Sequence, residues 1–431
     1  MTTALIGFAV LILLCFVGFR VGFATLAVGA GGFALERGAS AALSMVGQQV
    51  MEDAMNYNLS VIPLFILMGV FIYRSEISKD LYDAAYGALG GFRGGLASAT
   101  VLACGGFSAV CGSTLATAAT MSKVAMPPMR SFRYADSLAT GTIAAGGTLG
   151  IMIPPSVPLV IYGIIAQQDV GKLFMAGIVP GVLLIVLFLL TVTIVVRRNP
   201  DLAPPAEPLA PERRSEALRG IWPVGALFLL VLGGIYSGGF TATEAAGIGA
   251  FGAAVIAFFR GHLRSVASWR VCLTDATVTS AKIFIVIFGA LVFAQFVNLS
   301  GMPYDLLDVV KNWNMTGLQL VLFIVLVAVL MGMVFETIGI LLLLVPVFLP
   351  ALAAAGVDMI WFGIIVVLIS EIGLLTPPIG MNVFVVKSVL PDVKMGDIFR
   401  GVMPYIAALL VALALIVAVP GIATLLPNLM R

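Results

Sequence analysis

The stretch that decides the fold is GGTLGIMIPPSVPLVIYGI, residues 146–164. It is apolar enough to lie inside a membrane as a helix, but Pro154 and Pro155 stand in its middle. Each proline lacks a backbone N–H donor, and its ring collides with the preceding helical turn, so the helix must break there. A break at membrane depth leaves carbonyl groups without partners, and each unsatisfied group costs several kcal/mol. Some other group must therefore satisfy these carbonyls.

A second copy of this arrangement lies at residues 371–389, EIGLLTPPIGMNVFVVKSV. Gly150 corresponds to Gly373. At the same offset, Pro154 and Pro155 correspond to a second helix-breaking pair, Pro377 and Pro378. One such kink on its own is more readily a packing feature, but its duplication in two halves of a chain favours a transporter's binding site. The sequence therefore predicts two broken helices, over residues 141–165 and 358–390.

The composition is typical of an integral membrane protein built from helices. Of the 431 residues, 61% are hydrophobic and only 10% are charged. Several runs reach the roughly 20 apolar residues that cross a bilayer as a helix. An intramembrane enzyme would need a nucleophile beside a base, or a set of metal ligands, at depth. One histidine and one deep acid do not supply them, and no Walker-type loop for ATP occurs, so we expect neither an enzyme nor an ATPase.

The order of segments repeats along the chain. In the first half, residues 1–197, two apolar spans, a polar stretch at 48–58 and a third span precede a charged amphipathic arm at 74–93. In the second half, residues 220–431, two spans, a basic segment at 260–270 and a span at 276–298 precede a polar arm, at 300–317. Residues 198–219 carry five prolines and several charges, which predicts an extended linker between the halves.

Each arm is followed by a segment that does not suit one continuous helix. Residues 94–122 carry no charge, and their middle, CGSTLAT, is a poor centre for a span. Residues 318–357 carry one charge, Glu336. As a single helix they would be about 60 Å long, twice the thickness of the hydrocarbon core. The sequence therefore predicts two re-entrant hairpins, over 94–128 with its tip at 111–117 and over 318–355 with its tip at 335–339.

The distribution of basic residues predicts the orientation. The linker is placed in the cytoplasm because it carries Arg198, Arg213, Arg214 and Arg219. Threading outward from there makes the two halves an inverted repeat and puts both termini on the outer side. It leaves only four of the 23 Lys and Arg residues outside, which are Arg37, Lys172, Lys311 and Arg431.

The two tips and the two breaks are expected to meet near the middle of the membrane. Half-helices that end there point partial positive charges at anions, and freed carbonyls can coordinate a small cation. Hydroxyl and amide oxygens add to them, and an all-oxygen site suits a hard cation such as Na⁺. The candidate residues for binding a solute are Ser113, Thr114, Ser156, Thr337 and Asn382.

Glu336 is the one acid predicted at depth. A charge at the centre of a membrane helix costs roughly 2.5–3.5 kcal/mol on insertion scales, which favours a functional role. Either its carboxylate belongs to the ion or solute site, or it makes a hydrogen bond that fixes the hairpin tip. Glu244 and Lys282 lie near the ends of predicted spans, where snorkelling explains them.

Four ordered segments resemble the signature segments of the large membrane subunit of TRAP transporters, which are tripartite and ATP-independent. They are GGFSAVCGSTLATAATM (105–121), LGIMIPPSVPLVIYG (149–163), FETIG (335–339) and IGLLTPPIGMNVFV (372–385). The resemblance extends over essentially the whole chain. It implies an elevator-type secondary transporter of the bacterial inner membrane that imports an organic acid, a carboxylate, by symport with Na⁺. The outer side, where the threading puts both termini, is then the periplasm. It also implies two partners, a small four-helix membrane subunit and a periplasmic solute-binding protein, and no nucleic acid or organic cofactor.

The resemblance further implies two Na⁺ sites. The site between the first hairpin and the first break carries over to Ser108, Ser113, Gly150 and Pro154. The site between the second hairpin and the second break carries over to Glu336, Thr337, Gly373 and Thr376. The chain departs from the family at Cys111, where a small or hydroxyl residue is common. A self-sufficient Na⁺–carboxylate symporter of the same architecture is the alternative, and transport by this chain alone would favour it.

Overall fold

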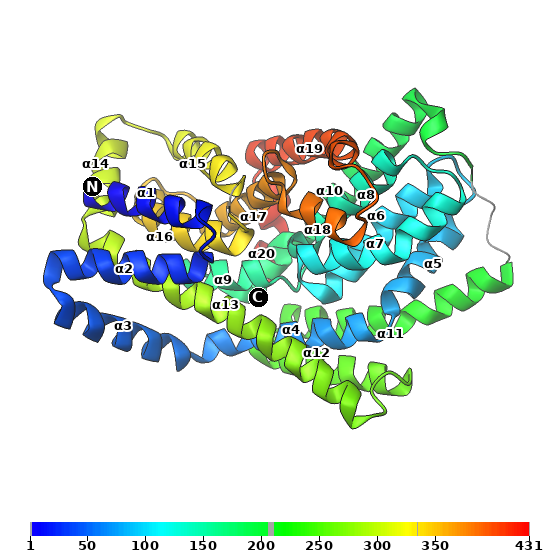
Figure 1. The fold of residues 1–431 in the computed structure, drawn as a ribbon, viewed down its shortest axis with the longest axis horizontal. Coiled ribbons are helices and arrows are strands. Elements are labelled where there is room, and N and C mark those ends of the chain that lie inside the picture. Colours follow the sequence, from blue (N-terminus) through cyan, green and yellow to red (C-terminus); the bar gives the residue numbers. More distant parts are fainter. Residues whose placement is uncertain (1, 206–210, 334, 431) are drawn as a thin grey trace.

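The computed structural model describes residues 2–205, 211–333 and 335–430, and within these ranges every regular element is a helix (Figure 1). The first half contains α1 (Thr2–Phe16), α2 (Val21–Arg37), α3 (Ala39–Ala54), α4 (Val61–Arg74), α5 (Ile77–Leu89), α6 (Gly95–Cys111), α7 (Thr114–Ser131), α8 (Asp136–Met152), α9 (Val157–Ile165) and α10 (Val170–Arg198). The second half contains α11 (Pro211–Tyr236), α12 (Ala242–Phe259), α13 (Val266–Leu299), α14 (Met302–Asn312), α15 (Gly317–Gly332), α16 (Thr337–Ala354), α17 (Met359–Leu375), α18 (Met381–Val389), α19 (Met395–Ala418) and α20 (Gly421–Leu429).

Seven of the described helices are long and apolar enough to cross a membrane. They are α4 together with the short 3₁₀ turn Tyr57–Ser60 before it, α10, α11, α12, α13, α16 and α19. An eighth span results if α8 and α9 are counted as one bent helix. The fold is therefore the all-α, polytopic membrane architecture that the sequence predicts.

Both predicted breaks occur at the Pro-Pro pairs. α8 ends at Met152 and α9 begins at Val157, and the two helices are bent by 41°. α17 ends at Leu375 and α18 begins at Met381. Gly380 precedes α18 with a φ of +64°, in the left-handed region that glycine adopts without strain. Both Pro-Pro peptide bonds are cis.

Each segment predicted to be a hairpin contains two consecutive helices. α6 and α7 are joined by a turn at Gly112, with a φ of +62°, and at Ser113, whose hydroxyl accepts a hydrogen bond from the Ala116 N–H at 3.4 Å. α15 ends at Gly332 and α16 begins at Thr337, inside the predicted tip; Val334, between them, lies outside the described residues. Re-entry of the two hairpins into the membrane stays a prediction.

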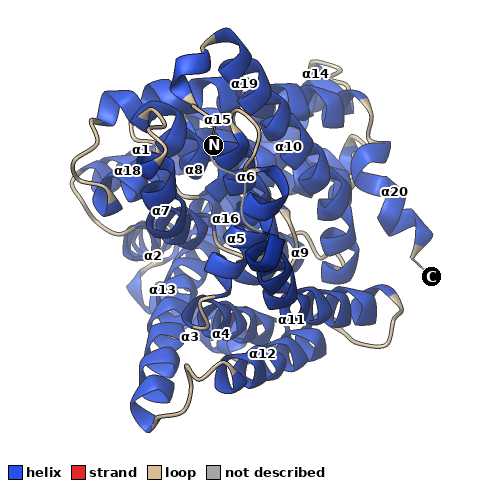
Figure 2. Ribbon diagram, turned by 90° about the vertical axis from the view of Figure 1, so that its right-hand side faces the viewer, coloured by secondary structure: helices blue, strands red, loops and turns tan. Residues whose placement is uncertain are grey.

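The helices form two layers. α4, α12 and α13 lie along one side, at the bottom of Figures 1 and 2, and the hairpins and broken helices lie above them. α2 packs against α13, and α4 packs against α12. In the predicted repeat, α2 corresponds to α12 and α4 corresponds to α13. The pair α2 with α13 is therefore the counterpart of the pair α12 with α4. The pairs α7 with α18 and α16 with α9 are related in the same way. The inversion of the halves relative to the membrane stays a prediction.

Glycines let these helices approach one another closely, as in other membrane helix bundles. A Cβ at Gly29 of α2 would lie 2.7 Å from the Cα of Phe293 in α13. A Cβ at Gly401 of α19 would lie 1.9 Å from the carbonyl oxygen of Ser137 in α8. The backbones themselves are in contact at both crossings, so many weak dispersion contacts hold the helices together there.

The linker is shorter than predicted. Helix α11 begins at Pro211, so the second half of the expected linker, 198–219, is helical. Proline is favoured in the first helical turn because the missing N–H would have no partner there, and the residues after it are mostly good helix formers. Before it, Pro200–Leu202 forms a 3₁₀ turn, and residues 206–210 lie outside the described part of the chain.

Three further helical segments differ from the sequence prediction. α3 occupies residues that the sequence assigns in part to a polar connection, and the sequence does not predict α20. α13 begins at Val266, inside the basic segment that was expected to precede a span at 276–298. Polar residues at membrane surfaces suit helices and loops equally, so their pattern does not distinguish the two.

Gly401→Ala is expected to destabilise the protein, because the added methyl group would overlap the Ser137 carbonyl and force α8 and α19 apart. Overpacking of this kind costs roughly 1–3 kcal/mol. The matched control is Gly396→Ala on the same helix, where nothing lies within 4 Å of the added Cβ. Thermal unfolding in detergent should show a lower apparent Tm for Gly401→Ala alone. Equal Tm values for the two variants would contradict this close crossing.

Candidate functional site

A cavity of about 440 Å³ lies where the two hairpin tips face the lower layer. The first tip lines it with residues 111–116, and the second tip lines it with residues 336–338. α4 and α13 close the opposite side. The charged residues of the lining are Glu336, on the second tip, and Lys282, on α13. This volume lies within the range of small-molecule sites.

The first tip packs directly on the first break. A Cβ at Gly150 would lie 2.7 Å from the carbonyl oxygen of Ser113, so only glycine lets the tip approach α8 this closely. A Cβ at Gly112 would lie 2.8 Å from the carbonyl oxygen of Pro155. Ser108 is buried behind the tip, and its hydroxyl donates to the Cys104 carbonyl at 2.6 Å. The structure thus brings together most of the first predicted Na⁺ set and adds Gly112 and Pro155, which are not in that set.

Pro154, the remaining member of that set, faces α10. A Cβ at Gly177 of α10 would lie 3.5 Å from the Cδ of Pro154 and 2.6 Å from the carbonyl oxygen of Met152. Gly177 therefore allows α10 to pack against the end of α8 at the break. The proline ring is a packing contact in this arrangement, and the carbonyl groups of the break lie next to it.

The second tip packs on the second break in the same manner. A Cβ at Gly373 would lie 2.5 Å from the Cα of Gly332, at the end of α15. Thr337 is buried, and its hydroxyl has no hydrogen-bond partner among the described residues. Thr376 donates its hydroxyl to the Ile372 carbonyl at 2.6 Å. Glu336 precedes α16, but its carboxylate does not cap the helix. Its place in the cavity lining favours a role in the ion or solute site over a hydrogen bond that only fixes the hairpin tip.

Two of the candidate solute-binding residues do not line the cavity. Ser156 is fully buried, accepts from the Leu159 N–H at 3.4 Å and donates to the Ile151 carbonyl at 2.6 Å, so it caps α9 and stabilises the break. Asn382 is fully buried in α18 and donates to the Ala144 carbonyl of α8 at 3.1 Å. Ser113, Thr114 and Thr337 do line the cavity. Side chains on one side of a break can point to opposite faces, and the sequence does not say which.

The sequence analysis missed two charged residues. Lys282 lies near the middle of α13 and lines the cavity, whereas the sequence places it near the end of a span. The basic segment 260–270 reads as a surface connection, so the sequence does not show that α13 begins within it. Glu371 lies next to the second break and is fully buried, and the Thr114 hydroxyl donates to its Oε1 at 3.1 Å. An acid inside an apolar run beside the Pro-Pro pair could have been noticed.

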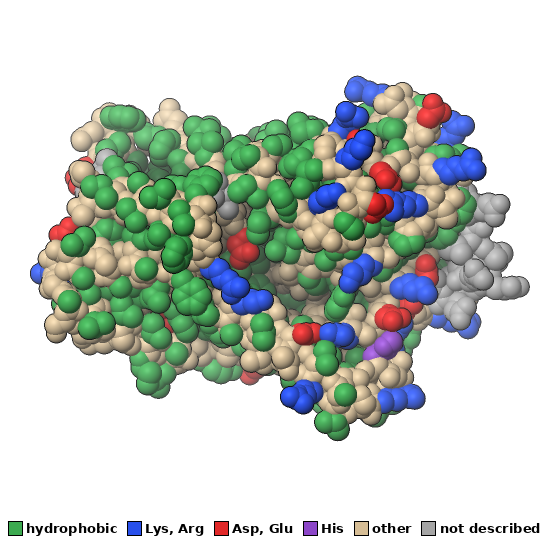
Figure 3. Space-filling view, viewed as in Figure 1, with side chains coloured by type: hydrophobic (Ala, Val, Ile, Leu, Met, Phe, Trp, Pro, Cys, Tyr) green, Lys and Arg blue, Asp and Glu red, His purple; other side chains and the backbone are tan. Residues whose placement is uncertain are grey.

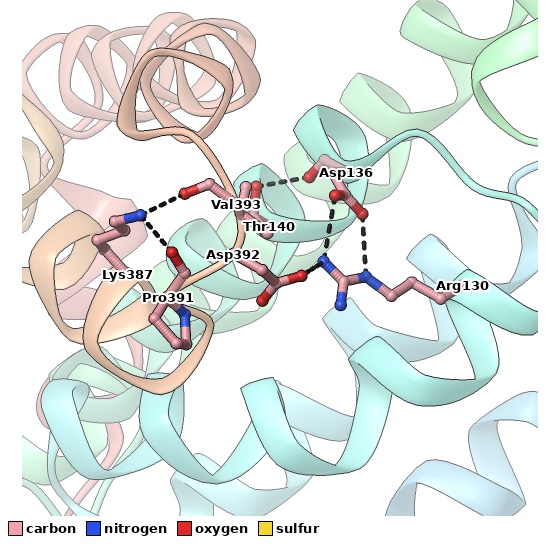
Figure 4. A network of polar contacts seen from close by, with 7 residues as sticks. All are labelled: Arg130, Asp136, Thr140, Lys387, Pro391, Asp392 and Val393. Atoms are coloured by element: carbon pink, nitrogen blue, oxygen red, sulfur yellow. Dashed lines mark hydrogen bonds and ion pairs between the residues drawn. The ribbon is translucent and has the colours of Figure 1, made fainter.

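A polar network joins three of the upper elements at the end away from the tips (Figure 4). Arg130, near the end of α7, donates to both carboxylate oxygens of Asp136, which begins α8, at 3.2 Å. It also donates to Asp392, in the loop after α18, at 2.5 Å. The same guanidinium lowers the pKa of the Asp392 carboxyl. Lys387 donates to the Pro391 and Val393 carbonyls at 2.7 Å and orders this loop. This polar network thus joins the first hairpin to both broken helices.

The model of one protein family, described as the DctM component of the tripartite ATP-independent periplasmic transporter, matches residues 8–422. The chain belongs to this family. The permease is 36% identical over 381 residues to the C4-dicarboxylate TRAP transporter large permease protein DctM of Pseudomonas aeruginosa, and the match covers 88% of each chain. It is 32% identical over 420 residues to the sialic acid TRAP transporter large permease protein SiaM of Vibrio cholerae, with 96% of each chain covered.

A solved structure extends the comparison to the fold. MtrF of Neisseria gonorrhoeae, from a class of antimetabolite efflux pumps, superposes with a TM-score of 0.61 at 13% identity, covering 90% of this chain and 85% of that chain. At this identity the likeness shows a shared fold. The family and its relatives confirm that the chain is a transport protein of a tripartite system and not an enzyme. Membership in a tripartite family implies a small membrane subunit and a periplasmic binding protein as partners.

Arg130→Gln is expected to lower the apparent Tm slightly near pH 7, because Asp136 and Asp392 both lose a cationic partner. The pKa of Asp392 is lowered in the folded state, so its share of this stabilisation is present above the ordinary aspartate pKa of about 3.9. It is lost as the pH falls through the lowered folded pKa. The Tm difference between wild type and variant should therefore stay constant from about pH 7 to pH 5 and shrink below about pH 4.

The control for this prediction is Arg133→Gln, in the same turn, since no ion pair of Arg133 is found within the described ranges. It should change the Tm little at any pH. A Tm difference for Arg130→Gln that persists unchanged in acid would show that packing of the side chain, and not its charge, stabilises the joint.

Proposed function

We propose that this permease imports an organic acid across the bacterial inner membrane by an elevator movement coupled to a Na⁺ gradient, and that a periplasmic solute-binding protein delivers the solute. The observation that carries the proposal is the cavity in which both hairpin tips face α4 and α13. A carrier of this kind needs one solute site between a part that moves and a part that stays. Relatives named for a C4-dicarboxylate and for sialic acid support an organic acid as the solute.

Na⁺ would bind where each tip meets its break. The same contact occurs in both halves, because the backbone of the hairpin packs against a glycine of the broken helix. Ser113 packs against Gly150, and Gly332 packs against Gly373. Carbonyl groups gather at these contacts, and carbonyl oxygens suit a hard cation. The unpartnered hydroxyl of Thr337 supports the second site. A bound cation would offset part of the desolvation cost of these oxygens.

The hairpins and broken helices would move as one unit. Arg130 ties α7 and α8 to the loop after α18, and Thr114 ties the first tip to α17. Both bonds connect elements of different halves, so neither half can move without the other. The short helices α5 and α14 join this unit to the spans before it and would serve as the two arms.

Lys282 would hold the carboxylate of the solute. It lies on α13, opposite the start of α7, and both line the cavity. The N-terminal end of a helix carries partial positive charge, so an anion between them would meet favourable charge from both sides. Glu336 in the same cavity would disfavour a bare anion, and a Na⁺ at the second tip would neutralise it.

The distribution of charge supports the proposed orientation. In Figure 3 the Lys and Arg side chains of the face shown gather over its right-hand part, and the left-hand part is mostly hydrophobic. The right-hand end contains the start of α11 (Figure 1). An excess of basic residues marks the cytoplasmic side of membrane proteins. We therefore propose that this end is cytoplasmic, and the threading of the sequence by its basic residues then puts both termini in the periplasm. The self-sufficient symporter is not favoured, because the chain belongs to a tripartite family.

The function is tested in liposomes that contain the permease with its small membrane subunit. With the periplasmic binding protein and its ligand outside, an inward Na⁺ gradient should drive uptake of the ligand at clamped pH without ATP. Omission of the binding protein should abolish uptake, because the tripartite system has no other route for the solute. Full uptake without the binding protein would support the self-sufficient symporter, and full uptake on a proton gradient alone would contradict Na⁺ coupling.

Lys282→Met is expected to weaken uptake of the acid, because one charge-assisted contact to the carboxylate is lost. Such contacts contribute about 1.5–3 kcal/mol, so the KM should rise roughly tenfold or more. Lys282→Arg, which keeps the charge, should restore most of the affinity. Lys311→Met, on α14 and away from the cavity, is the control. A KM unchanged in Lys282→Met would remove Lys282 from the solute site.

A further inference from the structure

We infer that Glu371 and Asn382 form a third cation site, which holds one Na⁺ behind the first hairpin tip. The inference rests on the proposed Na⁺ coupling for the identity of the cation. Its residues differ from those of both Na⁺ sites above. Glu371 comes from α17 and Asn382 from α18, and the third contributor is Thr114 of α7. The site thus joins the first hairpin to the second broken helix.

The carboxylate of Glu371 lacks a compensating charge. The residue is fully buried. Its Oε1 accepts the Thr114 hydroxyl at 3.1 Å, and its Oε2 has no hydrogen-bond partner among the described residues. None of the ion pairs found in the described ranges includes it. An isolated carboxylate in an apolar interior is costly, so Glu371 must either take up a proton or be accompanied by a cation.

Asn382 supplies a second free oxygen in the same region. Its Nδ2 donates to the Ala144 carbonyl, so the carbonyl end of the amide points away from that contact. This Oδ1 is buried and also lacks a partner in the part of the chain that the structure describes. A Cβ at Gly147 would lie 3.2 Å from both Asn382 Nδ2 and the Thr114 carbonyl oxygen. Gly147 thus lets α7, α8 and α18 converge, so Thr114, whose hydroxyl bonds to Glu371, also lies beside Asn382. These three residues are the proposed polar cluster.

The chemistry of this cluster suits a small monovalent cation. Its donors are carboxylate, amide and hydroxyl oxygens, which bind hard cations. One carboxylate balances one positive charge. No group of three or more His, Cys, Asp or Glu residues gathers anywhere in the described ranges, so a divalent or transition metal would lack the ligands it needs here. Thr114 also lines the cavity, which gives the ion a route when the first tip moves.

The test measures Na⁺ bound per permease directly. The full chain is purified with its small membrane subunit and titrated with ²²Na⁺ to saturation, with choline keeping the ionic strength constant. Glu371→Gln keeps the shape of the side chain and an acceptor for Thr114 but removes the charge, so it should bind one Na⁺ fewer than the wild type. Ser370→Ala is the matched control, because its buried hydroxyl bonds within α17 to the Val366 carbonyl. It should bind as the wild type does.

Asn382→Ala provides a second measurement that leaves the carboxylate in place. It should weaken one Na⁺ roughly tenfold, which is the loss expected for one polar contact to a charged group, and leave the others unchanged. This arm decides the matter if Glu371→Gln does not fold. Na⁺ counts and affinities equal to wild type in both variants would overturn the third site alone. A wild-type permease that binds no Na⁺ would overturn the proposed coupling and the third site together.

Discussion

The loss of helical hydrogen bonds where Pro-Pro pairs interrupt two apolar helices is the constraint on which the rest of this structure depends. Two Pro-Pro pairs interrupt α8–α9 and α17–α18 where the surroundings are almost wholly hydrophobic. A hairpin packs against each interruption. The glycine at each contact, Gly150 or Gly373, has no side chain that would prevent this close approach. Polar side chains of both tips, Ser113, Thr114, Glu336 and Thr337, thereby line one cavity between the tips and the lower layer.

The same constraint explains why the tips and breaks are held so firmly at their other ends. A polar centre can be useful only if its geometry survives movement of the elements that form it. Arg130 joins α7, α8 and the loop after α18, and Ser156 caps α9 so that the break ends in an ordered helix. Close glycine contacts such as that of Gly401 with Ser137 fix α19 against α8. Rigid support at a distance from the centre therefore accompanies the unsatisfied groups within it.

The sequence predicts the breaks and tips well because proline and glycine act through their own backbone. Their effects are local, so position in the chain is enough to locate them. What a side chain faces is a property of the folded molecule, and there the sequence is less informative. Ser156 and Asn382 follow the breaks as expected but point into the protein, not into the cavity. Lys282 was assigned to a membrane surface because a basic segment conceals where α13 begins.

The sequence also predicts linkers and surface helices less well. Pro211 is the last of the five prolines in the predicted linker, yet a proline in the first turn is compatible with the helix that begins there. Glu371 was also missed, although an acid inside the apolar run before the second Pro-Pro pair is visible in the sequence; its contact with Thr114 is not visible there. Local breaks are thus visible in the sequence, and contacts between the two halves are not.

The placement of Lys282 and Glu336 in one cavity has an energetic consequence for the return half of the cycle. With neither solute nor ion bound, the two side chains give the cavity no net charge. Adding an anion alone, or a cation alone, would leave one uncompensated charge in a low-dielectric space, at a considerable Born cost. On the proposed mechanism, this cavity has no net charge both when it is empty and when it holds one solute carboxylate with one Na⁺ at the second tip, so the carrier crosses easily in these two forms. Na⁺ would then leak only slowly in the absence of solute, and its gradient would be dissipated mainly by net import of the solute.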